Sequence, residues 1–292
     1  MEVNVITGGG SGIGYATARF LPKDQLVLIT GRSEKRLTEA ALRLQNEGHL
    51  VETATCDVSE QESVYKLIQK ASGLGIVRSV IHAAGVSASQ ATLTEIIRIN
   101  ALGVVHIVRG FSPIMKPDGC IAVIGSCSSA ALPGILLPRR SYPLALTNES
   151  AFIRRGTARA KLMPNDFLQK SFAYCMTKNF VRWYLLGCAF HYAQENVRIV
   201  CISPGVVDTD LGQAELKNPE TQAILRYTGL NRPAKPEEIG FLTSTVVDER
   251  NGYLLGTDIF CDGGCTAAGF GMMAAIREKV DSPISFRACF KL

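Results

Sequence analysis

The sequence predicts an α/β fold in which a doubly wound parallel sheet of seven strands carries helices on both faces. Three observations predict it. Short apolar runs alternate along the chain with segments of helical periodicity, as in right-handed strand–helix–strand units. A glycine-rich turn separates the first apolar run from the first helix. The length of 292 residues suits one large domain, so we expect residues 1–292 to form a single unit.

The elements follow in a regular order. The expected strands are Val3 to Thr7, Leu26 to Thr30, Val51 to Cys56, Val77 to His82, Cys120 to Gly125, Val197 to Ile202 and Asp258 to Cys261. The expected helices follow the glycine-rich turn, cover about 34–47, 61–71 and 92–111, and include one that carries Tyr174 and ends near Gln194.

Composition excludes several classes of protein. Hydrophobic residues make up 47% and charged residues 20% of the chain, which is typical of a folded globular protein and argues against disorder. The formal net charge is +5, and residues 132–170 alone hold seven Lys and Arg against two acidic residues. Since no long basic tract accompanies this excess, we expect no nucleic-acid partner.

Cysteine and histidine are scattered. Nine cysteines show no zinc-type pairs and four histidines lie far apart, so we expect no metal. Mostly apolar-flanked thiols in odd number suit a reducing compartment, and we expect a cytoplasmic protein. A strand begins within the first three residues, without the pattern of a signal peptide. The longest uncharged run, 119–138, is broken by Gly, Ser and Pro, so we expect no membrane span.

The segment Thr7 to Gly14 reads T-G-G-G-S-G-I-G and follows directly on the first strand. Gly8 would permit the tight turn, Gly12 would let backbone amides approach a pyrophosphate, and Gly14 would let the helix pack on the sheet. A glycine-rich loop elsewhere is often only a turn, but this placement predicts nucleotide binding.

The second strand ends in T-G-R-S. Gly31 stands where an acidic residue would accept the ribose hydroxyls of NAD, and Arg32 follows. Because a guanidinium pairs with a 2′-phosphate, this favours NADP(H) over NAD(H). The alternative is an exposed arginine at a strand end.

Tyr174 and Lys178 stand four residues apart, and so share one face of a helix. The positive charge can lower the phenol pKa and make it a proton donor near neutral pH. Ser126 directly follows the fifth strand and is the expected partner hydroxyl, with Ser128 and Ser129 as alternatives.

Further motifs complete an ordered set. They are Cys56-Asp57-Val58, Ala83-Ala84-Gly85, Asn100 in R-I-N-A-L-G, Ser126 in V-I-G-S, Tyr174 with Lys178, Pro204-Gly205 with Thr209, and Asp262-Gly263-Gly264. With the glycine-rich turn, this set resembles the short-chain dehydrogenase/reductase family over nearly the whole chain. One departure is Ala83, where the family often has Asn, so a structural hydrogen bond near the adenosine would be replaced or lost.

The resemblance implies a Rossmann-type oxidoreductase. Tyr174 would exchange a proton with the substrate oxygen, Lys178 would assist it and hold the nicotinamide ribose, and Ser126 would hydrogen-bond the substrate. Asn100 would help anchor a water chain, Asp57 would meet the adenine amino group, and Thr209 would contact the carboxamide. The implied cofactor contacts are Gly8, Gly10, Ser11, Gly12, Ile13, Gly14, Arg32, Ser33, Asp57, Val58, Ala83, Ala84, Gly85, Tyr174, Lys178, Pro204, Gly205, Val207 and Thr209.

The stretch from Ser126 to Tyr174 is much longer than the family's common spacing. We expect a helical insertion at about 132–170, periodic from Glu149 onward. Its S-Y-P-L-A-L-T-N-E-S-A is similar to bacterial 3α-hydroxysteroid dehydrogenase/carbonyl reductases. We expect it to block the family's tetramer contact at the Tyr174 helix, which leaves a monomer or homodimer. Its apolar residues could wall the substrate cleft; they are Leu136, Leu137, Tyr142 and Leu146. A surface excursion is the alternative.

Residues 206–232 match the family's substrate loop. Its apolar side chains suggest a hydrophobic ketone or secondary alcohol as substrate; they are Leu211, Leu216, Ile224, Leu225 and Tyr227. The tail, about 269–292, could cover the active site, pack at a dimer interface or touch a membrane surface, and we expect packing. Two other functions stay open: a biosynthetic ketoreductase whose arginines bind a polar or carrier-tethered intermediate, and a non-enzymatic NADP sensor.

Overall fold

A computed structural model of the chain describes residues 1–209, 212, 219–226 and 228–269. All seven strands pair in parallel in the order β3-β2-β1-β4-β5-β6-β7. The strands are β1 (Glu2–Thr7), β2 (Leu26–Gly31), β3 (Leu50–Thr55), β4 (Ile76–His82), β5 (Met115–Ile124), β6 (Val197–Pro204) and β7 (Asp258–Cys261). The predicted doubly wound sheet is therefore confirmed.

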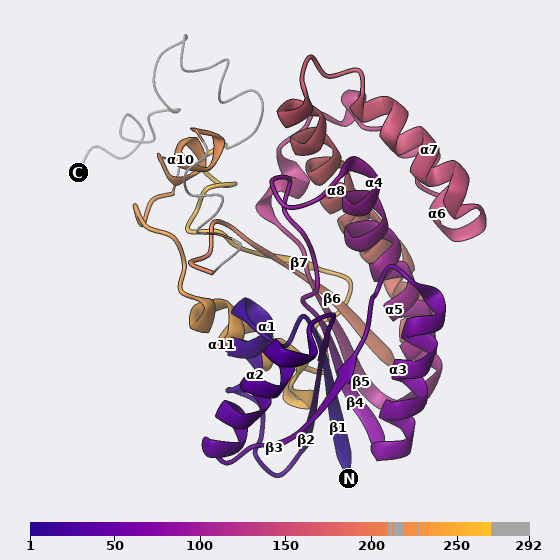
Figure 1. Cartoon of the computed structure of the whole chain (residues 1–292), viewed down its shortest axis with the longest axis vertical. Coiled ribbons are helices and arrows are strands. Elements are labelled where there is room, and N and C mark those ends of the chain that lie inside the picture. The colour runs from indigo at the N-terminus through magenta and orange to yellow at the C-terminus, as the bar shows by residue number, and fades with distance from the viewer. Residues whose placement is uncertain (210–211, 213–218, 227, 270–292) are drawn as a thin grey trace.

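Helices cover both faces of the sheet (Figure 1). The α-helices of the main body are α1 (Gly12–Ala18), α2 (Glu34–Asn46), α3 (Gln61–Leu74), α4 (Leu93–Ile97), α5 (Gly103–Phe111), α8 (Asp166–Gln194), α10 (Pro219–Arg226) and α11 (Pro236–Val247). Short helical turns η2 (Ser112–Ile114) and η6 (Glu249–Asn251) complete it. The helix at α11 was not among the predicted elements.

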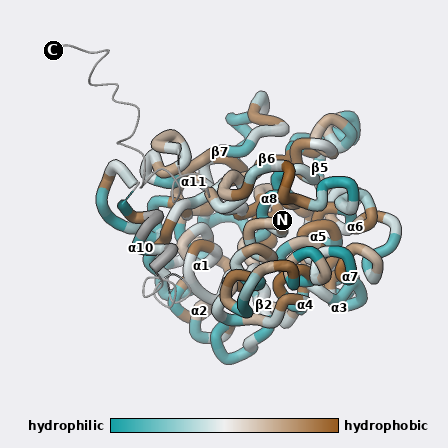
Figure 2. Tube along the Cα trace, turned by 90° about the horizontal axis from the view of Figure 1, so that it is seen from above, coloured by the Kyte–Doolittle hydropathy of each residue, from teal (hydrophilic) through white to brown (hydrophobic). Residues whose placement is uncertain are grey.

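Two hydrophobic cores result from the alternation of side chains along the strands. Val3 and Val5 of β1 join the core under α3, α5 and α8. Ile6 joins the core under α1, α2 and α11. Seen from above, the hydrophobic segments gather in the middle and the hydrophilic ones lie toward the rim (Figure 2).

The helix expected over 92–111 is confirmed, with one irregularity. Between α4 and α5, residues Arg98–Leu102 form a π-helical turn, η1, in which the amide of Gly103 donates to the carbonyl of Arg98. Asn100 stands in the middle of this wide turn. Such turns occur often at functional sites.

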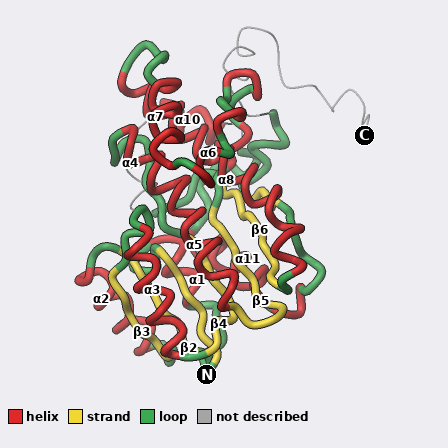
Figure 3. The backbone as a smooth tube through the Cα atoms, turned by 90° about the vertical axis from the view of Figure 1, so that its right-hand side faces the viewer, coloured by secondary structure: helices red, strands yellow, loops and turns green. Residues whose placement is uncertain are grey.

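The insertion is helical, as predicted. It follows the short turn η3 (Cys127–Ala130) and consists of the short turns η4 (Gly134–Leu136) and η5 (Arg139–Ser141), then α6 (Leu144–Thr147) and α7 (Glu149–Ala160). Figure 3 shows α6 and α7 beyond the strands, beside α4 and α8. α8 begins at Asp166, inside the stretch expected as the insertion, and Asn165 caps it by accepting from the amide of Leu168.

The expectation that Leu137 and Tyr142 wall a substrate cleft was wrong. Tyr142 is fully buried, and its ring packs edge-on against Phe180 and Trp183 of α8 at 5.4 Å each. Leu137 lies in the same core. These side chains attach the insertion to α8. Whether it blocks a tetramer contact stays a prediction.

Within the described residues, no helix has both the length and the apolar character of a membrane span. The same residues contain no group of three or more His, Cys, Asp or Glu side chains arranged to hold a metal ion.

Candidate active site

The predicted site residues meet where the strand order reverses. β1 and β4 are neighbours in the sheet, but their following helices lie on opposite faces. A crevice at the carboxyl ends of such strands is where open α/β sheets bind ligands. The glycine-rich turn, Ala83 and Ala84 all follow these two strand ends.

The glycine-rich turn approaches β4 more closely than any side chain would allow. Gly8 has φ +71°, and a Cβ there would lie 2.8 Å from the backbone of Ala83 and Ala84. Gly12 has φ +54°, and its Cβ would meet Thr209 Cγ2 at 3.2 Å. Ser11 is the N-cap of α1, yet its side chain makes no capping bond. The first amides of α1 thus remain available to an anion such as a pyrophosphate.

A cluster of cations follows β2. Arg32 is exposed, and Ser33 caps α2 by accepting from the amide of Arg36 at 3.4 Å. The backbone and Cβ of Arg36 lie against Gly10, within 3.6 Å of a Cβ placed there. Sequence reasoning missed Arg36, although a second arginine four residues after Arg32 signals it. Arg36 thus starts from the edge of the glycine-rich turn.

The turn after β3 presents a carboxylate. Asp57 Oδ1 accepts from the amide and the hydroxyl of Ser59 at 2.9 and 2.7 Å, and the Asp57 amide donates to Ser63 Oγ at 3.0 Å. Among the described residues, no hydrogen bond engages the other oxygen, Oδ2. Val58 beside it is buried. This is an arrangement that could receive an amino group such as that of adenine.

Lys178 reaches from α8 to the end of β5. It is buried at 9% exposure, and its Nζ donates to the carbonyl oxygen of Ile124 at 3.1 Å. The same Nζ lies 5.8 Å from the centre of the Tyr174 ring. Burial lowers the pKa of Lys178 to about 8. Lys178 thereby connects the phenol to the strand that ends two residues before Ser126.

Ser126 is buried at that strand end, where its Oγ accepts from the amide of Ser128 at 3.1 Å. Ser129 is the more deeply buried, and its carbonyl accepts from Asn179 of α8 at 2.7 Å. Of the three hydroxyls, only that of Ser126 directly follows the strand that Lys178 touches.

Asn100 fixes the loop after β4. Its Oδ1 accepts from the amide of Val86, and its Nδ2 donates to the carbonyl of the same residue, both at 2.9 Å. Both ends of the side chain are therefore engaged by backbone. The side chain of Asn100 therefore holds the loop after β4 in place. A water chain at this residue would have to bond to the backbone of the π-helical turn.

Comparisons with known proteins agree with this geometry. Residues 2–136 match the family model described as short chain dehydrogenase, and residues 160–266 match the one described as Enoyl-(Acyl carrier protein) reductase. The chain belongs to the short-chain dehydrogenase/reductase family. The region between the two matches, 137–159, falls within the insertion of this short-chain dehydrogenase/reductase.

Individual relatives of this short-chain dehydrogenase/reductase are distant but nearly co-extensive. Short-chain dehydrogenase/reductase bsc3 of Alternaria brassicicola is 27% identical over 267 residues, covering 90% of this chain and 95% of that protein. Tropinone reductase homolog At5g06060 of Arabidopsis thaliana is 24% identical, covering 91% and 92%. The family's members use NAD(P)(H), so the protein is an NAD(P)-dependent oxidoreductase.

Solved structures agree in fold. A short-chain type dehydrogenase/reductase from Mycobacterium ulcerans superposes with a TM-score of 0.73 at 21% identity, covering 96% of this chain and 94% of that one. A short-chain dehydrogenase/reductase from Serratia marcescens gives 0.71 at 19%, covering 91% and 98%.

One buried group of this short-chain dehydrogenase/reductase went unrecognised in the sequence. His82 ends β4, and its Nδ1 lies 2.8 Å from Thr7 Oγ1. Burial, and then the charge of Lys178, lower the pKa of His82 to about 3. The ring is therefore neutral and packs beneath the site without adding charge.

The substrate side of this short-chain dehydrogenase/reductase is only partly described. Leu211, Leu216 and Tyr227 lie outside the described residues, and Leu225 of α10 is half-buried. Thr209 Oγ1 accepts from the amide of Gly212 at 3.0 Å, which anchors the start of this loop near Gly12.

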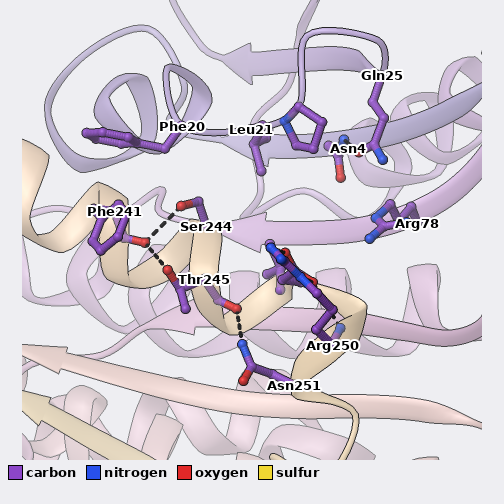
Figure 4. A pocket seen from close by; sticks show the side chains of 13 residues that line it. Asn4, Phe20, Leu21, Gln25, Arg78, Phe241, Ser244, Thr245, Arg250 and Asn251 are labelled. Carbon is purple, nitrogen blue, oxygen red and sulfur yellow. Dashed lines mark hydrogen bonds and ion pairs between the residues drawn. The ribbon is translucent and has the colours of Figure 1, made fainter.

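A separate pocket lies at the other end of the strands (Figure 4). It encloses about 510 Å³, and none of the predicted site residues line it. Phe20 and Phe241 meet edge to face at 5.6 Å, while Arg78 is already paired with Glu2 at 2.8 Å and Glu249 at 3.1 Å. We assign this pocket no part in the reaction.

Proposed function

We propose that the protein is an NADP(H)-dependent oxidoreductase that interconverts a hydrophobic ketone and its secondary alcohol, as a carbonyl reductase or hydroxysteroid-dehydrogenase-like enzyme. The observation that carries the proposal is the placement of Lys178 between Tyr174 and the end of β5. It brings an ammonium group next to a phenol. The same group contacts the last residue of β5, two residues before Ser126.

In reduction, the Tyr174 hydroxyl donates a proton to the carbonyl oxygen of the substrate, and in oxidation it removes the proton of the alcohol. The ammonium of Lys178 stabilises the negative charge that develops on the phenol oxygen. Ser126 donates a hydrogen bond to the substrate oxygen and orients it. Bound NADP(H) would supply or accept the hydride.

The cofactor would lie across the switch point. The glycine-rich turn would receive the pyrophosphate, Asp57 and Val58 the adenine, and Thr209 the carboxamide. The residues fit because Gly8 and Gly12 leave no room for side chains and α1 keeps its first amides uncapped by Ser11. Arg32 and Arg36 would pair with the 2′-phosphate.

The preference for NADP(H) is tested by titrating the protein with NADPH and NADH side by side. We expect NADPH to bind more tightly, and Arg32→Asp to remove the difference, because a charge-assisted contact contributes about 1.5–3 kcal/mol. Arg36→Asp should weaken NADPH in the same direction. Equal affinity for the two cofactors in the parent protein would refute the preference.

The proton donor is tested with Tyr174→Phe and a panel of bulky ketones. We expect the rate of NADPH oxidation to fall by at least about 100-fold, the usual scale of general acid catalysis, with little change in cofactor affinity. Residual turnover close to that of the parent would exclude Tyr174 as the donor.

A biosynthetic ketoreductase acting on a polar or carrier-tethered intermediate is a second candidate. It is favoured by Arg139, Arg140, Arg154 and Arg155, which are exposed and form no ion pair with any described residue. Replacing all four by Gln should then raise KM for an acidic carrier-linked substrate. An unchanged KM would leave the hydrophobic ketone as the better proposal.

A further inference from the structure

We propose that His106 positions the adenine end of the cofactor site and couples it to the insertion, through Val58 on one side and Glu149 on the other. The inference rests on the proposed function, in which Asp57 and Val58 receive the adenine. It adds a residue that would touch neither cofactor nor substrate.

The geometry begins with the imidazole itself. His106 lies on α5 and is 8% exposed. Its Nδ1 is 3.0 Å from the carbonyl oxygen of Val58, and its Nε2 is 2.9 Å from Glu149 Oε1. A peptide carbonyl and a carboxylate are both acceptors, whereas a neutral imidazole carries only one N–H. The ring therefore lies between two acceptors and joins them.

Val58 is held from two sides by α5. Its side chain packs directly on Gly103, where an added Cβ would lie only 2.8 Å from Val58 Cγ2. Its carbonyl receives the bond from His106 one helical turn further on. Because Val58 adjoins Asp57, both contacts help to set the position of the carboxylate that would meet adenine.

Glu149 brings the insertion into this network. It occupies the first turn of α7, directly after the N-cap Asn148, whose side chain accepts from the amide of Ala151 at 3.0 Å. The helix start is therefore fixed, and with it the position of the carboxylate. His106 and Glu149 are 43 positions apart in the sequence, so neither a motif nor helical periodicity predicts that they interact.

The same helix offers a matched control. Arg109 of α5 donates to the carbonyl oxygen of Leu146 in α6 at 3.3 Å. This contact also joins α5 to the insertion, but within the described part of the chain Arg109 makes no hydrogen bond to Val58. If the insertion affected cofactor binding only through its attachment to α5, replacing Arg109 and replacing Glu149 would weaken cofactor binding equally.

The experiment compares Glu149→Gln, His106→Leu and Arg109→Gln with the parent protein. For each, affinities are measured for 2′-phospho-ADP-ribose, for nicotinamide mononucleotide and for NADPH. We expect the first two variants to bind 2′-phospho-ADP-ribose about 3- to 10-fold more weakly, the effect of one lost hydrogen bond. Mononucleotide affinity and kcat at saturating NADPH should stay unchanged, while KM for NADPH rises. Arg109→Gln should match the parent throughout.

A spectroscopic measurement tests the bridge directly. Nitrogen-15 NMR of the histidine rings should show the Nε2 resonance of His106 shifted in Glu149→Gln relative to the parent, because the ring loses its carboxylate partner there. Since Glu149 is exposed, this variant keeps the fold even if His106→Leu does not.

Two outcomes would overturn the inference alone: an unchanged affinity for 2′-phospho-ADP-ribose in Glu149→Gln, or an equal loss in Arg109→Gln. If the parent protein bound neither NADPH nor 2′-phospho-ADP-ribose, the proposed function would fall and the positioning role with it.

Discussion

Lys178 is a cation held inside the protein, so its protonation is coupled to folding. Its pKa is about 8 in the folded protein against an ordinary value of 10.5. Between these two values the unfolded chain binds more protons, and the contribution of this group to stability therefore rises with pH. Below about pH 8 the charge is present in both states and the cost of burying it is fully felt.

We predict that Lys178→Met changes this dependence. The stability of the variant relative to the parent should be most favourable at neutral pH, and should decline by up to about 3 kcal/mol by pH 10.5. Urea unfolding of both proteins across this window, without cofactor, measures the difference. A difference that does not vary with pH would mean that Lys178 is not desolvated.

The sequence predicts Tyr174 and Lys178 as a pair because helical spacing alone brings them to one face. It does not predict that Lys178 ends on the carbonyl of Ile124, since that contact depends on how α8 crosses the sheet. His82 was overlooked for the same reason: its partner Thr7 is 75 positions away.

At the scale of elements, the insertion behaves as part of the core. Tyr142 is 0% exposed, and its hydroxyl donates to Asn179 Oδ1 at 3.1 Å. We predict that Tyr142→Ala lowers the free energy of unfolding by about 3–5 kcal/mol, as for other large aromatic side chains cut back in a core. Denaturant unfolding measures this.

The matched control is Ile135→Ala. Ile135 belongs to the same insertion but is 89% exposed, so the change should stay within about 0.5 kcal/mol. A small loss in Tyr142→Ala as well would mean that the insertion is the surface excursion that the sequence left open.

The apolar residues of the insertion could be recognised from the sequence, but not the surface they cover. Leu137 and Tyr142 have the chemistry of a substrate wall and of a core equally. The choice between them depends on the approach of Phe180 and Trp183, which no local pattern encodes. Helix α11 was also not predicted: the last helix expected from the sequence was the one that carries Tyr174.

At the scale of the whole molecule, the proposed cofactor should act as a stabilising ligand. A ligand at 100 times its Kd stabilises the folded state by about 2.7 kcal/mol. For a chain of this length we predict a rise in Tm of about 4–5 °C with NADPH. Thermal unfolding with NADH at the same concentration should give a smaller shift, and Arg32→Asp should reduce the NADPH shift. Equal shifts for both cofactors would contradict the proposed preference.

Strand number and strand direction were predictable at this scale, because alternating strands and helices leave few topologies. The outer limits of elements were less so. β5 begins at Met115 rather than Cys120, because Met115 pairs with Val77 of β4 ahead of an irregularity in the register. The arrangement of substrate loop and tail lies largely outside the described residues.

The π-helical turn at Asn100 has a geometric consequence for the helices around it. An i→i+5 turn holds one residue more than an α-helical turn, which rotates everything after it by about 100°. The helix before the turn therefore faces α7 and α8, whereas the helix after it faces α3 and the strands. The wide turn changes the direction in which successive side chains point. One continuous helical segment thereby packs against α8 with its first part and against the sheet with its second, and Asn100 stands at the change.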